Sequence, residues 1–281
     1  MSWFRDVGWR HLAAVTAVLY AVFPLIYVLS ASLSATGRLG DNRLFRTISL
    51  ANYQELLTSG HYPYLAWFTN TLVIGLTTSM ITVFMGSAAA YAFSRFRFTG
   101  RRTGLASLLV IQMFPQLLAF IAIFLLLLTF RDVFPVIGLN TRLGLILVYL
   151  GGALGVNTFL MYGFFNTVPR EIDEAAKIDG ASHARIFLTI VLRLVAPVLA
   201  VVGLLSFVGT FSEYLIASLV LQDVPKQTLA VGLFQFISQQ HSERWGMFAA
   251  GSILAAIPVV VLFQFLQRYI VAGLTSGSVK G

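Results

Sequence analysis

Cysteine is absent from this chain of 281 residues, and charged side chains are scarce. Without cysteine there is no disulfide bond, no thiolate catalysis and no thiolate metal site. Charged residues make up 11% of the chain, whereas hydrophobic residues make up 58% and the mean hydropathy is +0.83. This composition is far from that of a soluble domain and indicates a membrane protein. The histidines stand far apart, without the spacing typical of metal ligands: His11, His61, His183 and His241.

Basic residues outnumber acidic ones, 19 against 11, and give a net charge of +8. They are spread over many loops without a dense cluster, so they fit the flanks of membrane spans better than a nucleic-acid surface. The nucleotide-binding Walker A pattern G-x-x-x-x-G-K-[ST] is absent as well. The closest segment, "GLTSGSVKG" near the C-terminus, lacks the adjacent Gly-Lys-Ser/Thr that cradles phosphate. We therefore expect no nucleic-acid partner and no cofactor bound by this chain itself.

Six apolar stretches are each long enough to cross the hydrocarbon layer, which takes about 20 helical residues. They do not alternate between apolar and polar residues, as the strands of a membrane barrel would. The first stretch resembles a signal peptide, but its apolar part of about 22 residues exceeds the usual length of about 7 to 15, so we expect a retained helix. The sequence therefore predicts an all-α membrane protein with six transmembrane helices. The predicted spans are residues 12–33, 66–93, 104–130, 143–165, 187–221 and 247–270.

Lysine and arginine predict the orientation of these spans. With six spans both chain ends lie on one face, and that face carries more basic residues than the other. The segment "SRFRFTGRR", between the second and third spans, is its strongest single indicator. By the positive-inside rule this face is cytoplasmic, and we expect a multi-pass protein of the inner membrane with both termini in the cytoplasm.

The segment "EIDEAAKIDG" (171–180) lies on that face and holds four of the eleven acidic residues. Thr167 is expected to cap a short helix, and Pro169 suits its first turn. Gly180 can end the helix in a left-handed conformation, and Ser182 can cap the next one. Acidic groups are favourable at the start of a helix, so they either cap and solvate a surface helix or bind a partner. They are Glu171, Asp173, Glu174 and Asp179.

The longer segment "EAAKIDGASHARIFLTIVLRLVAP" resembles the EAA loop of ABC importer permeases, in which Glu-Ala-Ala is followed by Gly and later by Ile-x-Leu-Pro. Arg193 stands where that proline is usual, and we expect Pro197 to supply the bend instead. Other segments are similar to the smaller permease subunit of maltose-type carbohydrate importers: "QMFP", "IGLNT", "YLGG", "TLAVG" and the ending "GLTSGSVKG". The resemblance covers nearly the whole chain and is weakest before residue 60.

This resemblance implies a type I ABC importer permease fold and a single permease domain over residues 1–281. Its parts would be a first helix at 12–33, a core at 66–270, the EAA loop at 167–186, an exported loop at 222–246 and a tail at 271–281. The EAA helix is similar to a coupling helix, which docks into a cleft of a cytoplasmic ATPase subunit. The residues implied for this coupling are Glu171, Asp173, Glu174, Ala175, Ala176, Asp179, Gly180 and Ala181.

The resemblance also implies partners. Two ATPase subunits would hold ATP and Mg, and a second, different permease subunit would complete the translocation path. An extracytoplasmic sugar-binding protein would dock on the exported loop. The tail is either a solvated end or a segment that contacts the ATPase dimer; its candidate contact residues are Thr275, Ser276, Gly277 and Lys280.

Glu213 is an acidic residue inside a predicted span, where a carboxyl group costs about 2.5 to 3.5 kcal/mol. It is expected either to take part in the translocation path or to be a structural group hydrogen-bonded to neighbouring helices. Gly151 and Gly155 form a G-x-x-x-G step that favours close helix packing. Aromatic and polar neighbours either line a sugar path or pack between helices; these candidates are Gln112, Phe114, Gln116, Phe211, Ser212 and Tyr214.

The function expected from these features is that of a permease subunit in an ATP-driven importer of oligosaccharides of the maltose, maltodextrin or trehalose type. An ion-coupled secondary transporter would share the six spans, but it needs ionisable groups in series, and Glu213 is nearly alone. A membrane enzyme needs a nucleophile, a base or metal ligands, and no such motif occurs. Uptake that depends on ATP would distinguish the importer from a secondary transporter. A chemically changed product would distinguish a membrane enzyme from the importer.

Overall fold

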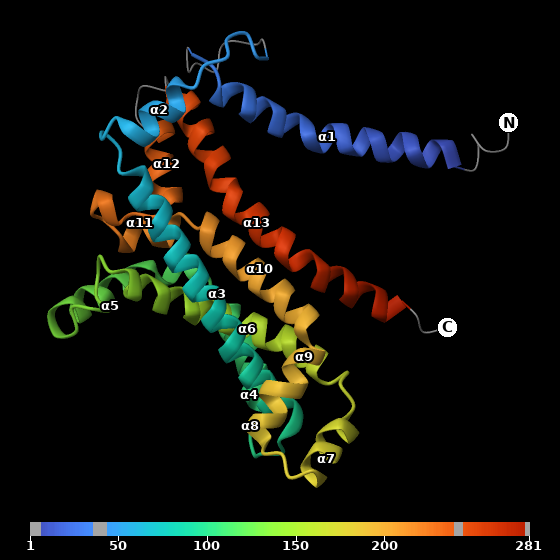
Figure 1. Ribbon diagram of the computed structural model, residues 1–281. Coiled ribbons are helices and arrows are strands. Elements are labelled where there is room, and N and C mark those ends of the chain that lie inside the picture. Colours follow the sequence, from blue (N-terminus) through green and yellow to red (C-terminus); the bar gives the residue numbers. More distant parts are fainter. Residues whose placement is uncertain (1–6, 36–43, 239–243, 279–281) are drawn as a thin grey trace. The chain divides into compact units, whose positions relative to one another are not determined.

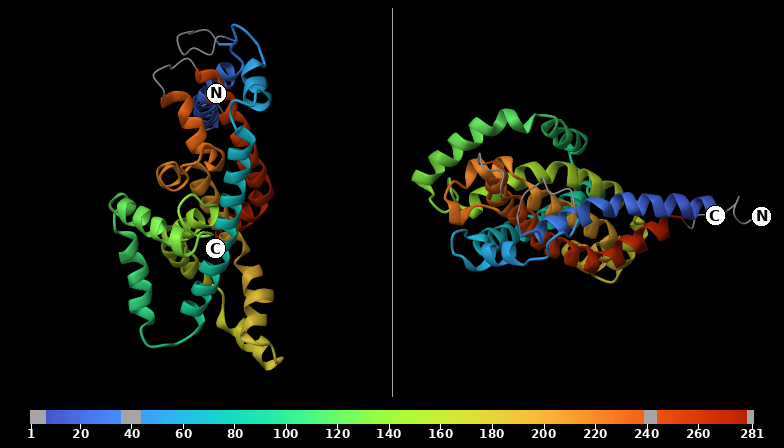
Figure 2. Two further views of the ribbon diagram at one scale, coloured as in Figure 1. Left: turned by 90° about the vertical axis from the view of Figure 1, so that its left-hand side faces the viewer. Right: turned by 90° about the horizontal axis from the view of Figure 1, so that it is seen from above.

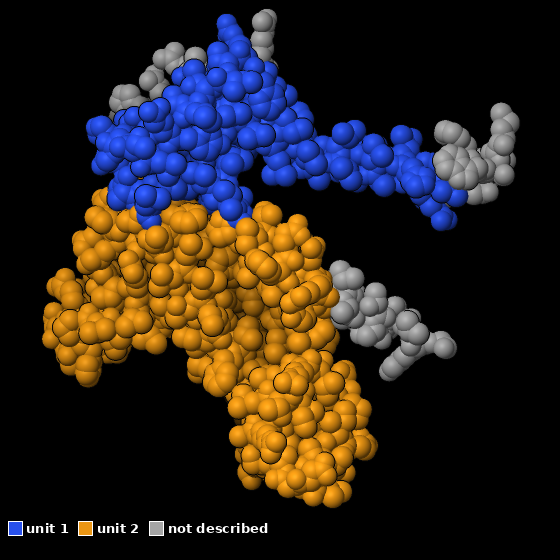
Figure 3. All heavy atoms as spheres, viewed as in Figure 1, with its two compact units in different colours: residues 1–65, 232–257 blue, residues 66–231, 258–281 orange. Residues whose placement is uncertain are grey.

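The computed structural model describes residues 7–35, 44–238 and 244–278 (Figure 1), and all of its regular elements in these ranges are helices. The all-α prediction is therefore confirmed. The chain divides into two compact units (Figure 3): residues 1–65 with 232–257, and residues 66–231 with 258–281. The longer helices are α1 (Trp9–Ser32), α2 (Ala51–Thr58), α3 (Tyr64–Arg95), α4 (Arg101–Gln112), α5 (Phe120–Val133), α6 (Arg142–Phe165), α7 (Arg170–Ile178), α10 (Ala196–Ser212), α12 (Leu229–Ser238) and α13 (Trp245–Ser278).

Shorter elements connect these helices. They are η2 (Gln116–Ala119), α8 (His183–Arg185), the π-helical turn η3 (Ile186–Val191), α9 (Leu192–Leu194), α11 (Leu215–Val220) and η4 (Val224–Lys226). In the left view of Figure 2, α4 lies to one side of the end of α3, and the corner between α7 and α8 lies to the other.

In the first unit, α2 closes the end of α1. Asn52 Nδ2 donates to the carbonyl oxygens of Ser32 and Ser34, at 2.9 Å each, and the Tyr53 hydroxyl donates to Ser32 Oγ at 2.8 Å. The bond to Ser32 O satisfies a carbonyl at the end of α1 that has no intrahelical partner. The apolar window of α1 is 0% buried, so its side chains present a continuous apolar surface suited to lipid or to another membrane helix.

In the second unit, α3 and α6 contribute to two apolar clusters, and α10 contributes to the second. Leu145 and Val220 belong to the first, together with α5 and α11 side chains, and Phe165 and Val202 belong to the second. All four side chains are buried. The helix α6 packs closely against α4 and α10. The second cluster extends from the end of α3 to α7 and η3, and it positions the region predicted to couple to a partner.

Four described helices are long and apolar enough to cross a membrane: α1, α3, α6 and α13. A bent pair, His183–Leu194 and Ala196–Ser212, would add a fifth if it forms one span. The predicted span 104–130 is not one helix, because α4 ends at Gln112 and α5 begins at Phe120. The predicted span 187–221 is also interrupted. The count of six spans stays a prediction.

A proline lies at or next to two of these interruptions. Proline lacks a backbone N–H, and it disfavours a helical conformation in the residue before it, so Pro115 ends the helical run after Met113. Pro197 lies in the first turn of α10, next to an 81° bend at Val195. The bend thus lies beside Pro197, and the expectation that Pro197 supplies it in place of the usual proline at Arg193 stays a prediction.

The "IGLNT" segment turns the chain from α5 into α6. A Cβ atom on Gly138 would lie 2.4 Å from the backbone Cα of Arg131, so only glycine fits there. Asn140 has a left-handed φ of 65°, which asparagine tolerates better than most residues. The Thr141 hydroxyl caps α6 by accepting from the Gly144 N–H at 3.0 Å. The segment thus encodes a fixed turn.

Candidate functional site

The helix α7 carries the predicted coupling residues. It begins at Arg170, directly after Pro169, and its first turn contains Glu171 and Asp173 as predicted. The prediction that Thr167 caps this helix is wrong, because its hydroxyl donates to the Phe164 carbonyl at 2.8 Å. Thr167 therefore satisfies the end of α6, and the fixed φ of proline provides the start of α7.

The corner after α7 has the predicted conformation. Gly180 has a φ of +81°, the left-handed region in which glycine is favoured. The Gly180 N–H donates to Lys177 O and the Ala181 N–H donates to Ala176 O, at 2.9 Å each. This is the Schellman pattern, which satisfies the last carbonyls of a helix. Ser182 then caps α8 by accepting from the Arg185 N–H at 3.3 Å, so the chain turns sharply and enters the bent pair.

The eight predicted coupling residues do not all face outward. Ala176 and Asp173 are buried, and Ile172 packs on the same inner side against the apolar cluster. Ala181 is half-buried against that cluster. The expectation that all the acids face a partner is therefore corrected for Asp173. The exposed side chains form what we term the outer face of α7: Glu171, Glu174, Ala175, Lys177 and Ile178, followed by Asp179 and Gly180.

Asp173 forms a buried ion pair with Arg95, the last residue of α3. The Arg95 Nε and Asp173 Oδ2 atoms lie 2.7 Å apart, with side-chain exposures of 6% and 7%. The same guanidinium group donates to the carbonyls of Phe165 at 3.2 Å and Val168 at 3.0 Å. A charge removed from water needs such partners, because burial without them is costly. The pair thus connects α3, the end of α6 and α7.

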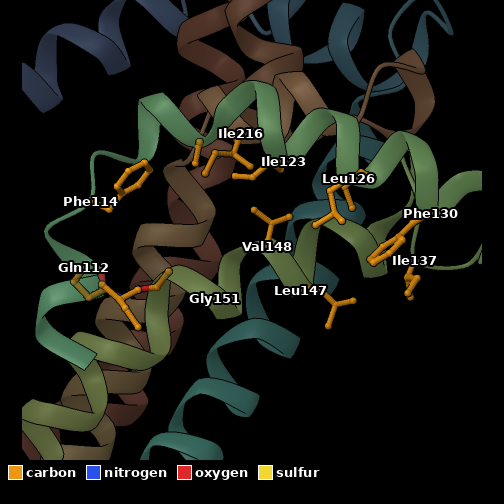
Figure 4. A pocket seen from close by; sticks show the side chains of 14 residues that line it. Gln112, Phe114, Ile123, Leu126, Phe130, Ile137, Leu147, Val148, Gly151 and Ile216 are labelled. Carbon is orange, nitrogen blue, oxygen red and sulfur yellow. The ribbon is translucent and has the colours of Figure 1, made fainter. Parts of the chain in front are cut away.

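A first cavity, of about 360 Å³, lies between α5 and α6 (Figure 4). Its wall is almost wholly apolar. Gln112 is the last residue of α4 and Phe114 lies within the break that follows, and Gln112 Nε2 donates to Gly152 O at 2.6 Å (Figure 4). The side chain of Gln116, the third candidate here, lies outside the described residues. A helix break at membrane depth is tolerated where it lies against protein or lines a cavity, so this break marks a candidate path.

Gly155 fits the predicted role in helix packing, whereas Gly151 does not. A Cβ atom on Gly155 would lie 2.7 Å from Gln112 Nε2 and 2.9 Å from the Leu108 carbonyl. No atom lies within 4 Å of such a Cβ on Gly151, which lines the first cavity instead. The close approach of α4 to α6 therefore depends on Gly155.

A second cavity, of about 240 Å³, lies beside Glu213 and is more polar. Glu213 ends α10; its Oε2 accepts from the Tyr149 hydroxyl at 2.7 Å. Its two carboxylate oxygens also accept from the backbone N–H groups of Ile216 at 2.8 Å and Ala217 at 2.9 Å. The structural role predicted for Glu213 is thus present, and its place in a cavity wall keeps the path role open.

Three polar residues in this second cavity were missed by the sequence reasoning: Asn157, Ser206 and Thr210. Ser206 Oγ is buried and, within the described part of the chain, has no hydrogen-bond partner. An amide such as Asn157 inside an apolar span was the available signal. A buried polar atom that lines a cavity without a partner is suited to bind a polar ligand or water.

The remaining path candidates near Glu213 differ in exposure. Phe211 is buried and packs on Phe207, with ring centroids 5.3 Å apart, so its role is packing. Ser212 is exposed, and its hydroxyl donates within its own helix to Val208 O at 2.9 Å. Tyr214 packs against the first apolar cluster. None of these three side chains lines either of the two cavities.

The start of α3 fixes part of the predicted exported loop. Residues 239–243 of that loop and Lys280 of the tail lie outside the described residues, as do the side chains of Thr275, Ser276 and Gly277. Three α3 side chains hold the backbone of segment 224–229. Trp67 Nε1 donates to Val224 O at 2.7 Å, Asn70 Nδ2 donates to Pro225 O and Gln227 O at 3.0 and 2.9 Å, and Thr71 Oγ1 accepts from the Leu229 N–H at 2.7 Å.

Comparison with known proteins agrees with this arrangement. Residues 82–276 match the family model of the binding-protein-dependent transport system inner membrane component. The chain is 42% identical to the maltodextrin transport system permease protein MdxG of Bacillus subtilis, over 92% of this chain and 91% of that protein. It is 36% identical to the maltose/maltodextrin transport system permease protein MalG of Escherichia coli, over 96% of this chain and 95% of that protein.

A solved structure shares the fold. It is a chain of a bacterial ABC transporter involved in the import of the acidic polysaccharide alginate, with a TM-score of 0.75 and 25% identity. The match covers 95% of this chain and 97% of that chain. The several apolar helices, the family model and these relatives agree. The chain therefore belongs to the family of binding-protein-dependent transport system inner membrane components.

Proposed function

We propose that this chain is the permease subunit of an ATP-driven importer of oligosaccharides of the maltose or maltodextrin type. The observation that carries the proposal is α7, a short helix with an exposed outer face and an inner face fixed to α3. The identity of 42% to a maltodextrin permease supports the substrate class. The protein lies in the inner membrane, with α7 and both chain ends in the cytoplasm by the positive-inside rule.

The outer face of α7 docks on a partner that hydrolyses ATP. Glu174 is exposed in the middle of this face, and Ile178 at its end is 87% exposed. A large apolar side chain beside a carboxylate fits an apolar pocket with a basic rim on the partner. Two ATPase subunits with ATP and Mg supply the energy, since this chain has no Walker A pattern.

The sugar path runs beside the two interrupted helices. The two cavities share Val148, Gly152 and Ile216, so both border the same stretch of α6. Sugar hydroxyl groups can donate to the Glu213 carboxylate and exchange hydrogen bonds with Asn157 and Ser206. One chain supplies one wall of this path, and a second, different permease subunit supplies the opposite wall. An extracytoplasmic sugar-binding protein delivers the sugar at the loop that contains segment 224–229.

The test uses the assembled complex in lipid, with its candidate partner permease and ATPase. Its ATPase activity is measured with and without a sugar-loaded binding protein, for the native chain and for Glu174→Ala. We expect stimulation in the native complex and loss of stimulation in the variant. Asp132→Ala is the matched control, because Asp132 is an exposed carboxylate on α5 with a side-chain exposure of 75%. Equal stimulation of ATPase activity in all three forms would contradict a coupling role for Glu174.

An ion-coupled secondary transporter predicts a different outcome. Uptake would then follow a proton or sodium gradient without ATP. Glu213 is the acidic group that such coupling would use, but its carboxylate already accepts three hydrogen bonds from this chain. Both carboxylate oxygens are therefore already engaged in holding the helix break between α10 and α11, which is a structural role. The observation favours the ATP-driven importer.

A further inference from the structure

We propose that Arg95 and Asp173 form an ionic lock that fastens α7 to the end of α3, so that a displacement of α7 is delivered to α3. The inference rests on the proposed function, in which a partner moves α7. It concerns positioning: neither residue lies on the outer face that would meet the partner. The lock is defined by Arg95, Asp173 and the two carbonyls that Arg95 binds.

The helix α7 needs an anchor to transmit force. It has nine residues, a length at which an isolated helix in water is marginal. Its outer face contributes no ion pair within the described chain. Its inner face offers only two apolar side chains to this cluster, Ala176 and Ile172, so apolar contact area alone is limited. The Arg95–Asp173 contact is the strongest specific attachment available to it.

Arg95 serves several chain segments at once. Its Nε lies 2.7 Å from Asp173 Oδ2, and its terminal nitrogens donate to Phe165 O, at the end of α6, and to Val168 O, in the connection to α7. The planar guanidinium group donates to the two carbonyls in a fixed geometry that a lysine would not reproduce, while its Nε faces Asp173 as an ion pair without a hydrogen bond among the described residues. When α7 moves with Asp173, the last turn of α3 therefore moves with it or the contacts break.

Neighbouring bonds strengthen the same junction. Ser94 Oγ donates to Asn166 Oδ1 at 2.9 Å, and an Arg170 terminal nitrogen donates to Ser94 O at 2.9 Å. Both bonds join the end of α3 to the segment before or at the start of α7. The junction therefore includes backbone and side-chain hydrogen bonds in addition to the ion pair.

Asp173 depends on Arg95 in particular. Among the described residues, Arg95 is the only cation paired with Asp173, and Asp173 Oδ1 is buried without a hydrogen-bond partner. The rings of Tyr91 and Phe187, whose centroids lie 5.1 Å apart, belong to the buried cluster at this junction. Low local polarity strengthens the attraction between the two charges and penalises either charge alone. Separation of the pair is therefore unfavourable throughout a movement of α7.

The experiment replaces the ion pair by a reversible covalent link. Because the chain has no cysteine, Arg95→Cys with Asp173→Cys places two thiols at the lock and none elsewhere in this subunit. The partners are made without cysteines as well. A short bifunctional methanethiosulfonate joins the two thiols, and a reductant releases them. The assay is the number of ATP molecules hydrolysed per sugar transported by the complex in lipid vesicles.

We expect the unlinked double variant to hydrolyse at least about fivefold more ATP per sugar than the native complex, the lower bound of a typical coupling between two sites. Cross-linking should bring this ratio back toward the native value, and reduction should raise it again. A monofunctional methanethiosulfonate, which modifies both thiols without joining them, should not restore it. A purely structural role would change the amount of assembled complex instead of this ratio.

A native ratio in the unlinked variant would overturn the lock, and so would a formed cross-link that leaves transport uncoupled. If the double variant does not assemble, Asp173→Asn provides the test, since it keeps the shape and removes the charge; a native ratio there would likewise overturn the proposal. The native complex separates the two hypotheses: absence of ATP-driven uptake in it contradicts the proposed function, whereas normal uptake with an unaffected variant contradicts only the lock.

Discussion

Glu213 offers the sharpest test of how the helix break beside the second cavity is held. The change is Glu213→Gln, which keeps the size of the side chain and replaces one carboxylate oxygen with an amide nitrogen. In the native chain Oε2 accepts from the Tyr149 hydroxyl and the Ala217 N–H, and Oε1 accepts from the Ile216 N–H. An amide nitrogen cannot accept, so at least one of these bonds is lost whichever way the glutamine is oriented.

The cost follows from the number of bonds. If the glutamine oxygen takes the Oε2 place, the nitrogen faces the Ile216 N–H and one hydrogen bond to a charged group is lost, worth about 1.5 to 3 kcal/mol. Tyr149→Phe removes one side-chain donor and leaves both backbone bonds, and side-chain bonds within membrane proteins average about 0.6 kcal/mol. We therefore expect Glu213→Gln to destabilise the chain more than Tyr149→Phe.

Two measurements on the same preparations check this order. Unfolding of the purified complex in detergent gives the stability of each variant, and uptake per folded complex gives the transport rate. Ser212→Ala is the control, because the Ser212 hydroxyl is exposed and donates within its own helix. Unchanged unfolding of both variants would refute the structural account. If Glu213→Gln lowers uptake by more than it lowers the amount of folded protein, Glu213 also takes part in the translocation path.

Two further substitutions test the packing and the loop. Gly155→Ala should destabilise the chain by about 1 to 3 kcal/mol, because its Cβ would overlap Gln112 and the Leu108 carbonyl. Gly151→Ala is the control and should unfold like the native chain, because no atom lies within 4 Å of its Cβ. Equal unfolding of the two variants would contradict this packing. Asn70→Ala should lower the free energy of unfolding by about 1 to 3 kcal/mol, because it removes a buried donor to Pro225 O and Gln227 O. It should also increase hydrogen exchange in segment 224–229 and reduce the stimulation of ATPase activity by the binding protein. The exposed Thr69→Ala should do neither, since its hydroxyl bonds within α3, and native exchange in the Asn70 variant would count against this anchor.

Much of the fold was predictable from the sequence, because apolar length and composition determine membrane helices directly. The bounds predicted for 143–165 and observed for α6 nearly coincide. Interruptions were harder to predict. Hydropathy averages over a window, so the break after Gln112 was absorbed into one predicted span, although Pro115 marked it. At the break beside Glu213, the Glu213 carboxylate accepts hydrogen bonds from backbone N–H groups. A hydropathy window does not detect such bonds.

At the candidate site, rules for turns and helix caps predicted the local backbone correctly, but they could not predict contacts between residues far apart in the sequence. Gly180 and Ser182 behave as their residue types require, since turn and cap chemistry is local. The burial of Asp173 depends on Arg95, which lies far away along the chain, and no local rule connects the two. A helical-face argument would have helped, because Ile172 and Ala176 place Asp173 on the inner side of α7.

The measurement that tests the central claim most directly is uptake of labelled maltodextrin into vesicles that contain this chain with its partner permease and ATPase. The binding protein and sugar are supplied on the exported side, and ATP, a nonhydrolysable ATP analogue or an ion gradient is supplied in turn. The account predicts accumulation with ATP, none with the analogue and none with a proton or sodium gradient alone. Accumulation driven by an ion gradient without ATP would contradict it.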